Sequence, residues 1–154
     1  MNTDALKALF EVNHYAIGAN ARDLTHEESL KEPHPGANSA NWVLGHIVHN
    51  RRYILEMVGE QPVWTEQEGE PYKRGSQPID RQAAKNYPDL LQALDLSQER
   101  LMAGLSRLPD EKLGLVSDKE SLGRKLAFLQ FHEAYHAGQL GILRRVAGKP
   151  GAIK

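Results

Sequence analysis

The chain has 154 residues, of which 40% are hydrophobic and 25% charged, and its formal net charge is −1. This composition is ordinary for a soluble globular protein with a buried core. The near-zero net charge disfavours nucleic acid or an anionic membrane as a partner. No apolar run approaches the roughly 18–20 residues of a membrane span. The chain has no cysteine, which excludes disulfides and thiolate ligands and leaves histidine and carboxylate side chains for any metal.

The first predicted helix runs from about Thr3 to Leu24, with Thr3 or Asp4 as its N-cap. Asn13 and Asn20 fall on the same face as its apolar residues, and two interpretations stay open. They line a polar cavity, or they bond to backbone where two helices cross. The residues before the helix lack the layout of a signal peptide, which predicts a cytoplasmic protein. The apolar face consists of Leu6, Phe10, Ile17 and Leu24.

Residues 25–38 are polar and contain two prolines and a glycine, which predicts a linker. His26 and His34 belong to this linker and are predicted to lie at the surface. His14 lies at the edge of the apolar face of the first helix and is predicted to be peripheral.

The second predicted helix runs from about Ser39, a good N-cap, to Val58, and Gly59 ends it. Its inward face carries His46 and His49, together with Trp42 and Tyr53 four residues away from them. One or both histidines can therefore point into the protein.

Residues 59–83 form a long connection with three prolines and two glycines besides Gly59, and without sustained periodicity. Connections of this length are uncommon in compact domains unless they have a role. Two roles fit: a crossover along the length of a helical bundle, or a flap over a site. Trp64 and Tyr72 either pack onto the core, which we favour, or line a pocket.

The third predicted helix covers about Pro88 to Leu108, with the proline in its first turn. Its leucines form an apolar stripe that we assign to packing alone. The fourth runs from about Leu122 to Val146 with Ser121 as its cap. Four long amphipathic helices and no strand alternation predict an all-α, single-domain, four-helix bundle. The long connection between helices two and three permits an up-down-down-up order.

The fourth helix carries the main functional pattern, His132-Glu133-Ala134-Tyr135-His136. Residues four apart lie above one another on a helix, so His132 and His136 can present their imidazoles to one metal ion. Both lie in the apolar stripe, where an unpartnered polar group is costly and a divalent cation supplies a partner. The alternative is a pair of histidines bonded to backbone or water.

The same five residues match H-E-x-x-H, the helix of zinc proteases in which the glutamate is the general base. The context argues against a protease, because no Glu, Asp or His follows His136 to act as a third ligand. No strand is predicted that could hold an extended peptide by its edge.

Two blocks, residues 41–47 (Asn-Trp-Val-Leu-Gly-His-Ile) and residues 132–140, resemble the DinB/YfiT-like superfamily of metal-binding four-helix bundles. The resemblance covers nearly the whole chain. It implies that His46, His132 and His136 bind a divalent metal, with zinc or nickel expected. It also implies a homodimer, and an activity such as the transfer of a low-molecular-weight thiol or hydrolysis of a small-molecule substrate.

Three neutral imidazoles leave an open position on the metal, the pattern of a catalytic site. A water or thiol bound there loses its proton more readily. Glu133 is the candidate catalytic residue, as a general base or as a partner of a ligand; the alternative is a salt-bridged or solvated glutamate. Gln139 is a candidate partner of a ligand, and His49 a candidate for the pocket wall. A non-catalytic bundle with a structural metal is the rival function.

Overall fold

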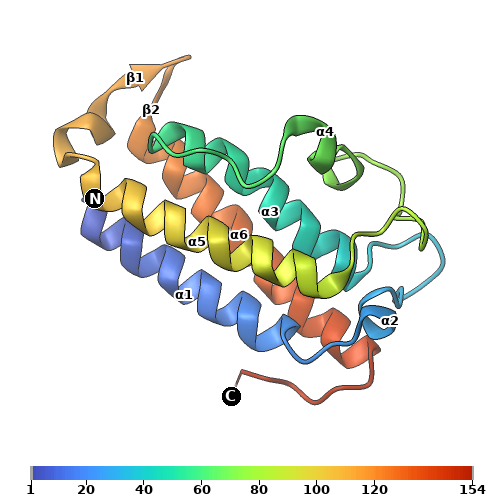
Figure 1. Ribbon diagram of the computed structural model, residues 1–154. Helices are drawn as coiled ribbons and strands as arrows, with labels where there is room; N and C mark the ends of the chain where they lie inside the picture. Colours follow the sequence, from blue (N-terminus) through green and yellow to red (C-terminus); the bar gives the residue numbers. More distant parts are fainter. Residues whose placement is uncertain (1, 154) are drawn as a thin grey trace.

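The computed structural model describes residues 2–153 and has four long helices (Figure 1). These are α1 (Thr3–Ala21), α3 (Ala40–Met57), α5 (Tyr87–Arg107) and α6 (Leu122–Val146). α1 and α6 run in one direction and α3 and α5 in the other, as Figure 1 shows. The predicted all-α bundle with up-down-down-up order is therefore confirmed. Within residues 2–153, no helix is long and apolar enough to cross a membrane.

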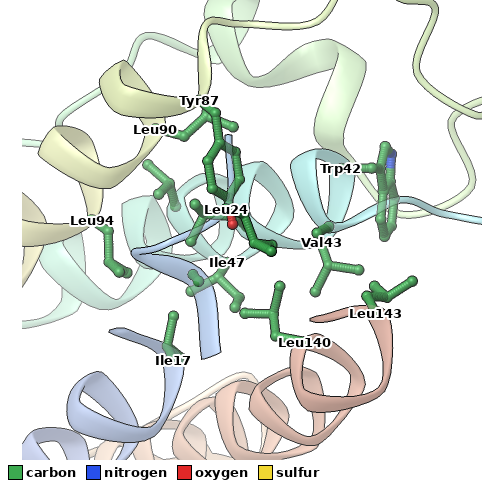
Figure 2. Packing of buried hydrophobic residues seen from close by; sticks show 14 of the residues in the cluster. Ile17, Leu24, Trp42, Val43, Ile47, Tyr87, Leu90, Leu94, Leu140 and Leu143 are labelled. Atoms are coloured by element: carbon green, nitrogen blue, oxygen red, sulfur yellow. The ribbon is translucent and has the colours of Figure 1, made fainter. Parts of the chain in front are cut away.

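The packing of the four helices defines which of them are neighbours. α1 and α3 each pack against both α5 and α6, so α1 lies diagonally opposite α3. The two helices that carry the candidate histidines, α3 and α6, are thus antiparallel neighbours. Figure 2 shows side chains from all four helices pointing toward one another in the core; among them are Ile17, Ile47, Leu94 and Leu140.

The predicted helix ends are mostly right, and their caps explain where they fall. Ser39 and Ser121 accept hydrogen bonds from the first turns of α3 and α6. The cap of α1 is Asn2, whose side chain accepts from the Ala5 N–H at 2.9 Å, so the prediction of Thr3 or Asp4 is wrong by one residue or two. α1 ends at Ala21, three residues before the predicted Leu24.

Several short elements were not predicted. These are α2 (His26–Ser29), α4 (Glu66–Gly69), two 3₁₀ turns, η1 (Glu70–Tyr72) and η2 (Asp110–Gly114), and a hairpin of β1 (Val116–Ser117) and β2 (Glu120–Ser121). Two-residue strands are too short to show alternation, so the expectation of no strand is corrected here. His26 lies in α2 and is half-buried, and the Nδ1 atom of His26 accepts from the Tyr87 N–H at 3.3 Å. The prediction that His26 lies at the surface is therefore wrong. His34 is exposed, as predicted.

The connection between α3 and α5 crosses the bundle while packing closely on α3. Tyr72 is fully buried and Trp64 half-buried against it, which confirms the favoured core position of both rings. Gly45 permits this contact, because a Cβ atom on it would lie 2.2 Å from Cδ1 of the Tyr72 ring. Gly69 likewise lies directly against His49, whose Nδ1 would be 2.2 Å from an added Cβ.

The leucine stripe suggested that α5 serves apolar packing alone, but the helix also makes a buried polar contact. Its Ser97 is fully buried and accepts a hydrogen bond from Arg51 of α3 at 3.0 Å. The Leu94 carbonyl accepts from both Arg51 and the Ser97 hydroxyl. A charged side chain inside the bundle requires such partners, because an unpaired buried charge is highly unfavourable.

Candidate metal centre

α3 and α6 bring three histidines together at one place in the bundle. His46 Nε2 lies 3.3 Å from His132 Nε2, which lies 3.1 Å from His136 Nε2. One ring nitrogen from each residue lies within 4.8 Å of the other two. His132 and His136 meet because they are one helical turn apart, whereas His46 reaches them only through the packing of α3 on α6.

The spacing of these nitrogens fits a divalent metal. Zinc binds imidazole nitrogen at about 2.0–2.1 Å, so two ligands on a tetrahedral ion lie about 3.3 Å apart. The two separations of 3.3 and 3.1 Å agree with this value. The three predicted ligands are therefore together in a geometry that fits a metal, and their role as ligands stays a prediction.

Two of the three rings are oriented by hydrogen bonds at their other nitrogen. His46 Nδ1 lies 2.6 Å from the Tyr72 carbonyl oxygen, and His136 Nδ1 lies 2.7 Å from Gln139 Oε1. Oxygen acceptors require a proton on Nδ1, which leaves Nε2 as the unprotonated nitrogen of each ring. The Nε2 of His46 also lies 3.1 Å from Asn50 Nδ2, one helical turn along α3. Gln139 thus contacts one of the predicted ligands, and its role as a partner of a metal ligand stays a prediction. The contact of His46 with a backbone carbonyl from the crossover was not predicted, since backbone groups leave no mark on side-chain patterns.

Burial keeps these histidines neutral. It lowers the pKa of His46 to about 4, although the hydrogen bond to the Tyr72 carbonyl acts in the opposite direction. Burial, followed by the charges of His136 and Arg74, lowers the pKa of His132 to about 4. Burial also lowers the pKa of His136. Neutral imidazole is the form that binds metal, so the site is ready for a cation at neutral pH.

A cavity of about 370 Å³ opens at the three histidines. One wall is Trp42, whose ring stacks on His46 at 4.7 Å and whose Nε1 donates to the Ser76 hydroxyl at 2.9 Å. Arg74, Tyr135, Asn38 and Gln139 complete the lining. Arg74 and Tyr135 were not singled out in the sequence, where one is a loop residue and the other lies inside the histidine motif.

Glu133 lies in the core and is paired with Arg51. Its Oε1 accepts from Arg51 Nε at 2.9 Å, and its Oε2 accepts from Arg51 Nη2 at 3.1 Å. Both side chains are essentially inaccessible to water, at 0% and 1% exposure. Glu133 is thus salt-bridged, which was the alternative interpretation. The catalytic role of Glu133 stays a prediction.

The remaining candidates lie outside the histidine cluster. His49 is buried beneath α4 and lies edge-on to Tyr53, so it does not line the cavity. Asn13 donates to the Gln130 carbonyl at 2.7 Å and Asn20 to the Ala137 carbonyl at 3.2 Å, which confirms the helix-crossing interpretation. Both asparagines also line a separate cavity of about 400 Å³ between α1 and α6, so the cavity interpretation holds as well. His14 is half-buried on α1 beside Asp95, away from the cavity lining.

Comparisons with known proteins concern the family and the fold. A family model described as the DinB superfamily matches residues 11–140. The fold is similar to the crystal structure of a conserved protein from Enterococcus faecalis, with a TM-score of 0.76 and 18% sequence identity. That alignment covers 97% of this chain and 99% of the other. A search of curated proteins gave no match.

Proposed function

Because the chain belongs to the DinB superfamily, we propose that His46, His132 and His136 bind one divalent metal ion, zinc or nickel, and that the protein is a metal-dependent enzyme. The observation that carries this proposal is the convergence of three Nε2 atoms, two of them on rings whose Nδ1 is hydrogen-bonded to oxygen. Such an ion favours the anion of a bound water or thiol, which is the chemistry that it supplies.

The reaction that we propose is transfer of a low-molecular-weight thiol to a small-molecule substrate, with hydrolysis as the second reaction class. Three protein ligands leave room for one exogenous ligand on a four-coordinate ion. The cavity of about 370 Å³ at the histidines supports access for that ligand. Trp42 and Tyr135 supply apolar walls that bind and orient an organic substrate.

The rival function is a structural metal in a non-catalytic bundle. A structural zinc site has four protein ligands and no open position. Within residues 2–153, the group of histidine and acidic side chains close enough to hold a metal has three members. A helical core of two large apolar clusters also supports folding without a metal. The rival therefore predicts unfolding when the metal is removed, whereas our proposal predicts a folded metal-free protein.

Metal analysis of protein purified without an affinity tag tests the site. We expect about one metal ion per chain in the wild type. His132→Ala should lower metal affinity at least a hundredfold, because it removes one of three ligands. His34→Ala, which alters an exposed histidine outside the cluster, is the matched control and should bind metal normally. Normal metal content in His132→Ala would overturn the proposed site.

We further propose that the protein acts as a homodimer through α6. The outward face of this helix carries Phe128, Phe131, Tyr135 and Ile142, all between 58% and 64% exposed. Their spacing of three, four and seven residues places them along one stripe. An apolar stripe without charges suits the same stripe on a second copy related by a two-fold axis.

A further inference from the structure

Arg74 differs from Arg81, the other arginine of the crossover, in its contacts. It lines the cavity at the histidines and is exposed to solvent. Within residues 2–153, no side-chain carboxylate forms an ion pair with it, whereas Arg81 of the same connection binds Glu27 at 2.7 Å. A guanidinium without a protein partner keeps its five N–H donors available to a ligand.

The position of Arg74 is determined by a turn that is attached to α3 on both sides. The Ser76 N–H donates to the Lys73 carbonyl at 3.1 Å, and Gly75 supplies the positive φ of +82° that the third residue of this turn requires. Before the turn, the Tyr72 carbonyl accepts from His46. After it, the Ser76 hydroxyl accepts from Trp42 Nε1.

These two attachments join the crossover to the residues that form the cavity floor and wall. Arg74 is therefore carried beside the histidines by the same backbone that orients one of them. Its charge also acts on the site, since it contributes to the lowered pKa of His132 after burial and His136.

We propose that Arg74 binds an oxyanionic group of the substrate, a carboxylate in the simplest case, while another group of the same molecule occupies the open position at the metal. Arginine binds carboxylates through two parallel N–H···O bonds, which orient the ligand as well as attract it. The substrate class is thus a small organic anion whose reacting group and carboxylate are separated by a short chain. This inference rests on the proposed metal site.

The test uses the full chain loaded with cobalt(II), whose absorption reports thiolate binding. Two probes are titrated: 3-mercaptopropionate, which carries a carboxylate, and the uncharged 2-mercaptoethanol. Arg74→Gln should lower the affinity for 3-mercaptopropionate about tenfold and leave that for 2-mercaptoethanol unchanged, as expected for loss of one exposed charge-assisted contact. High salt should also reduce the affinity of the wild type for 3-mercaptopropionate, because salt screens the charge of Arg74.

Arg81→Gln removes the same charge from the same connection and is the control; it should behave as the wild type. Equal affinities of Arg74→Gln and the wild type for both thiols would overturn the inference while leaving the metal site intact. A parallel loss for both thiols would also overturn it, because Arg74 would then act on the whole site. Failure of the wild type to bind cobalt would overturn the metal site itself, and this inference with it.

Discussion

Glu133 is next to a candidate ligand in the sequence, yet its carboxylate faces Arg51 in the bundle core. Replacing it with glutamine leaves a buried guanidinium without its counter-charge. We expect Glu133→Gln to lower the free energy of unfolding, measured by urea denaturation, by about 3–5 kcal/mol. Metal affinity of the folded variant should stay within a few-fold of the wild type.

The double variant Arg51→Met with Glu133→Leu is the control for this experiment. Replacing both members of a buried pair by apolar side chains is often neutral for stability, so the double variant should recover most of the loss. Turnover of Glu133→Gln at full metal occupancy should equal that of the wild type. A large loss of turnover with an intact fold would instead assign Glu133 to catalysis.

The lowered pKa values of the site histidines determine how metal binding depends on pH. Free histidines titrate near 6.5, so protons would compete with metal below that value. In the folded protein, burial lowers the pKa values of His46 and His132 to about 4. Burial lowers the pKa of His136 as well. We therefore expect metal affinity, measured by competition with a chelator, to fall at a lower pH than the 6.5 of free histidine. A midpoint at 6.5 would contradict the burial of these rings.

The same shifts affect the stability of the metal-free protein. The unfolded chain binds protons at these histidines below about pH 6.5, while the folded chain does so only near 4. Folding stability is therefore complete above 6.5 and falls as the pH decreases from 6.5 toward 4. His14 contributes in the same direction, since burial lowers its pKa to about 4.

At the scale of elements, a substitution at Gly45 tests whether the crossover holds His46 in place. Alanine is favoured over glycine in a helix by about 1 kcal/mol, but a Cβ at this position would meet the Tyr72 ring at 2.2 Å. Gly45→Ala should therefore displace Tyr72 and remove its carbonyl from His46. We expect metal affinity to fall about ten- to a hundredfold, the usual cost of losing a partner of a ligand.

Gly141→Ala on α6 is the matched control, because its Cβ would lie at an ordinary 3.5 Å from Asn20. It should keep wild-type metal affinity. If Gly45→Ala also binds metal normally, the Tyr72 carbonyl does not orient His46 in solution.

The elements differ in how far the sequence predicts them, for physical reasons. The long helices follow from periodicity and from caps such as Ser39 and Ser121, which are local signals. The pair of His132 and His136 is local too, since both lie on one helix. The pairing of Arg51 with Glu133 spans 82 residues. It depends on how α3 packs on α6, so no local pattern reveals it.

At the scale of the whole molecule, the bundle order was predictable and the site was predictable only in part. A long connection permits parallel neighbours, which α3 and α5 are (Figure 1). The meeting of His46 with the α6 pair was expected from family resemblance rather than from spacing. The roles of the Tyr72 carbonyl and Arg74 arise from the path of an irregular segment, which side-chain periodicity does not encode. The single-domain organisation and cytoplasmic location stay predictions.

The proposed homodimer is also tested on the whole molecule. Phe131→Glu places a charge in the exposed stripe of α6 and should convert dimer to monomer, as measured by sedimentation equilibrium at one protein concentration. Leu115→Glu alters an exposed apolar residue that lies outside the α6 stripe and should stay dimeric. A wild type that sediments as a monomer would rule out the dimer.

The contact between the crossover and His46 has a consequence for kinetics. A metal ion held by these rings, of which His132 is only half-buried, would leave when one of them turns away, and the Tyr72 carbonyl opposes that rotation for His46. Release of the ion by rotation of His46 would then require the crossover to open from α3. We expect zinc release and hydrogen–deuterium exchange of the amides around Tyr72 to share one opening step, so that a variant which accelerates one accelerates the other in proportion.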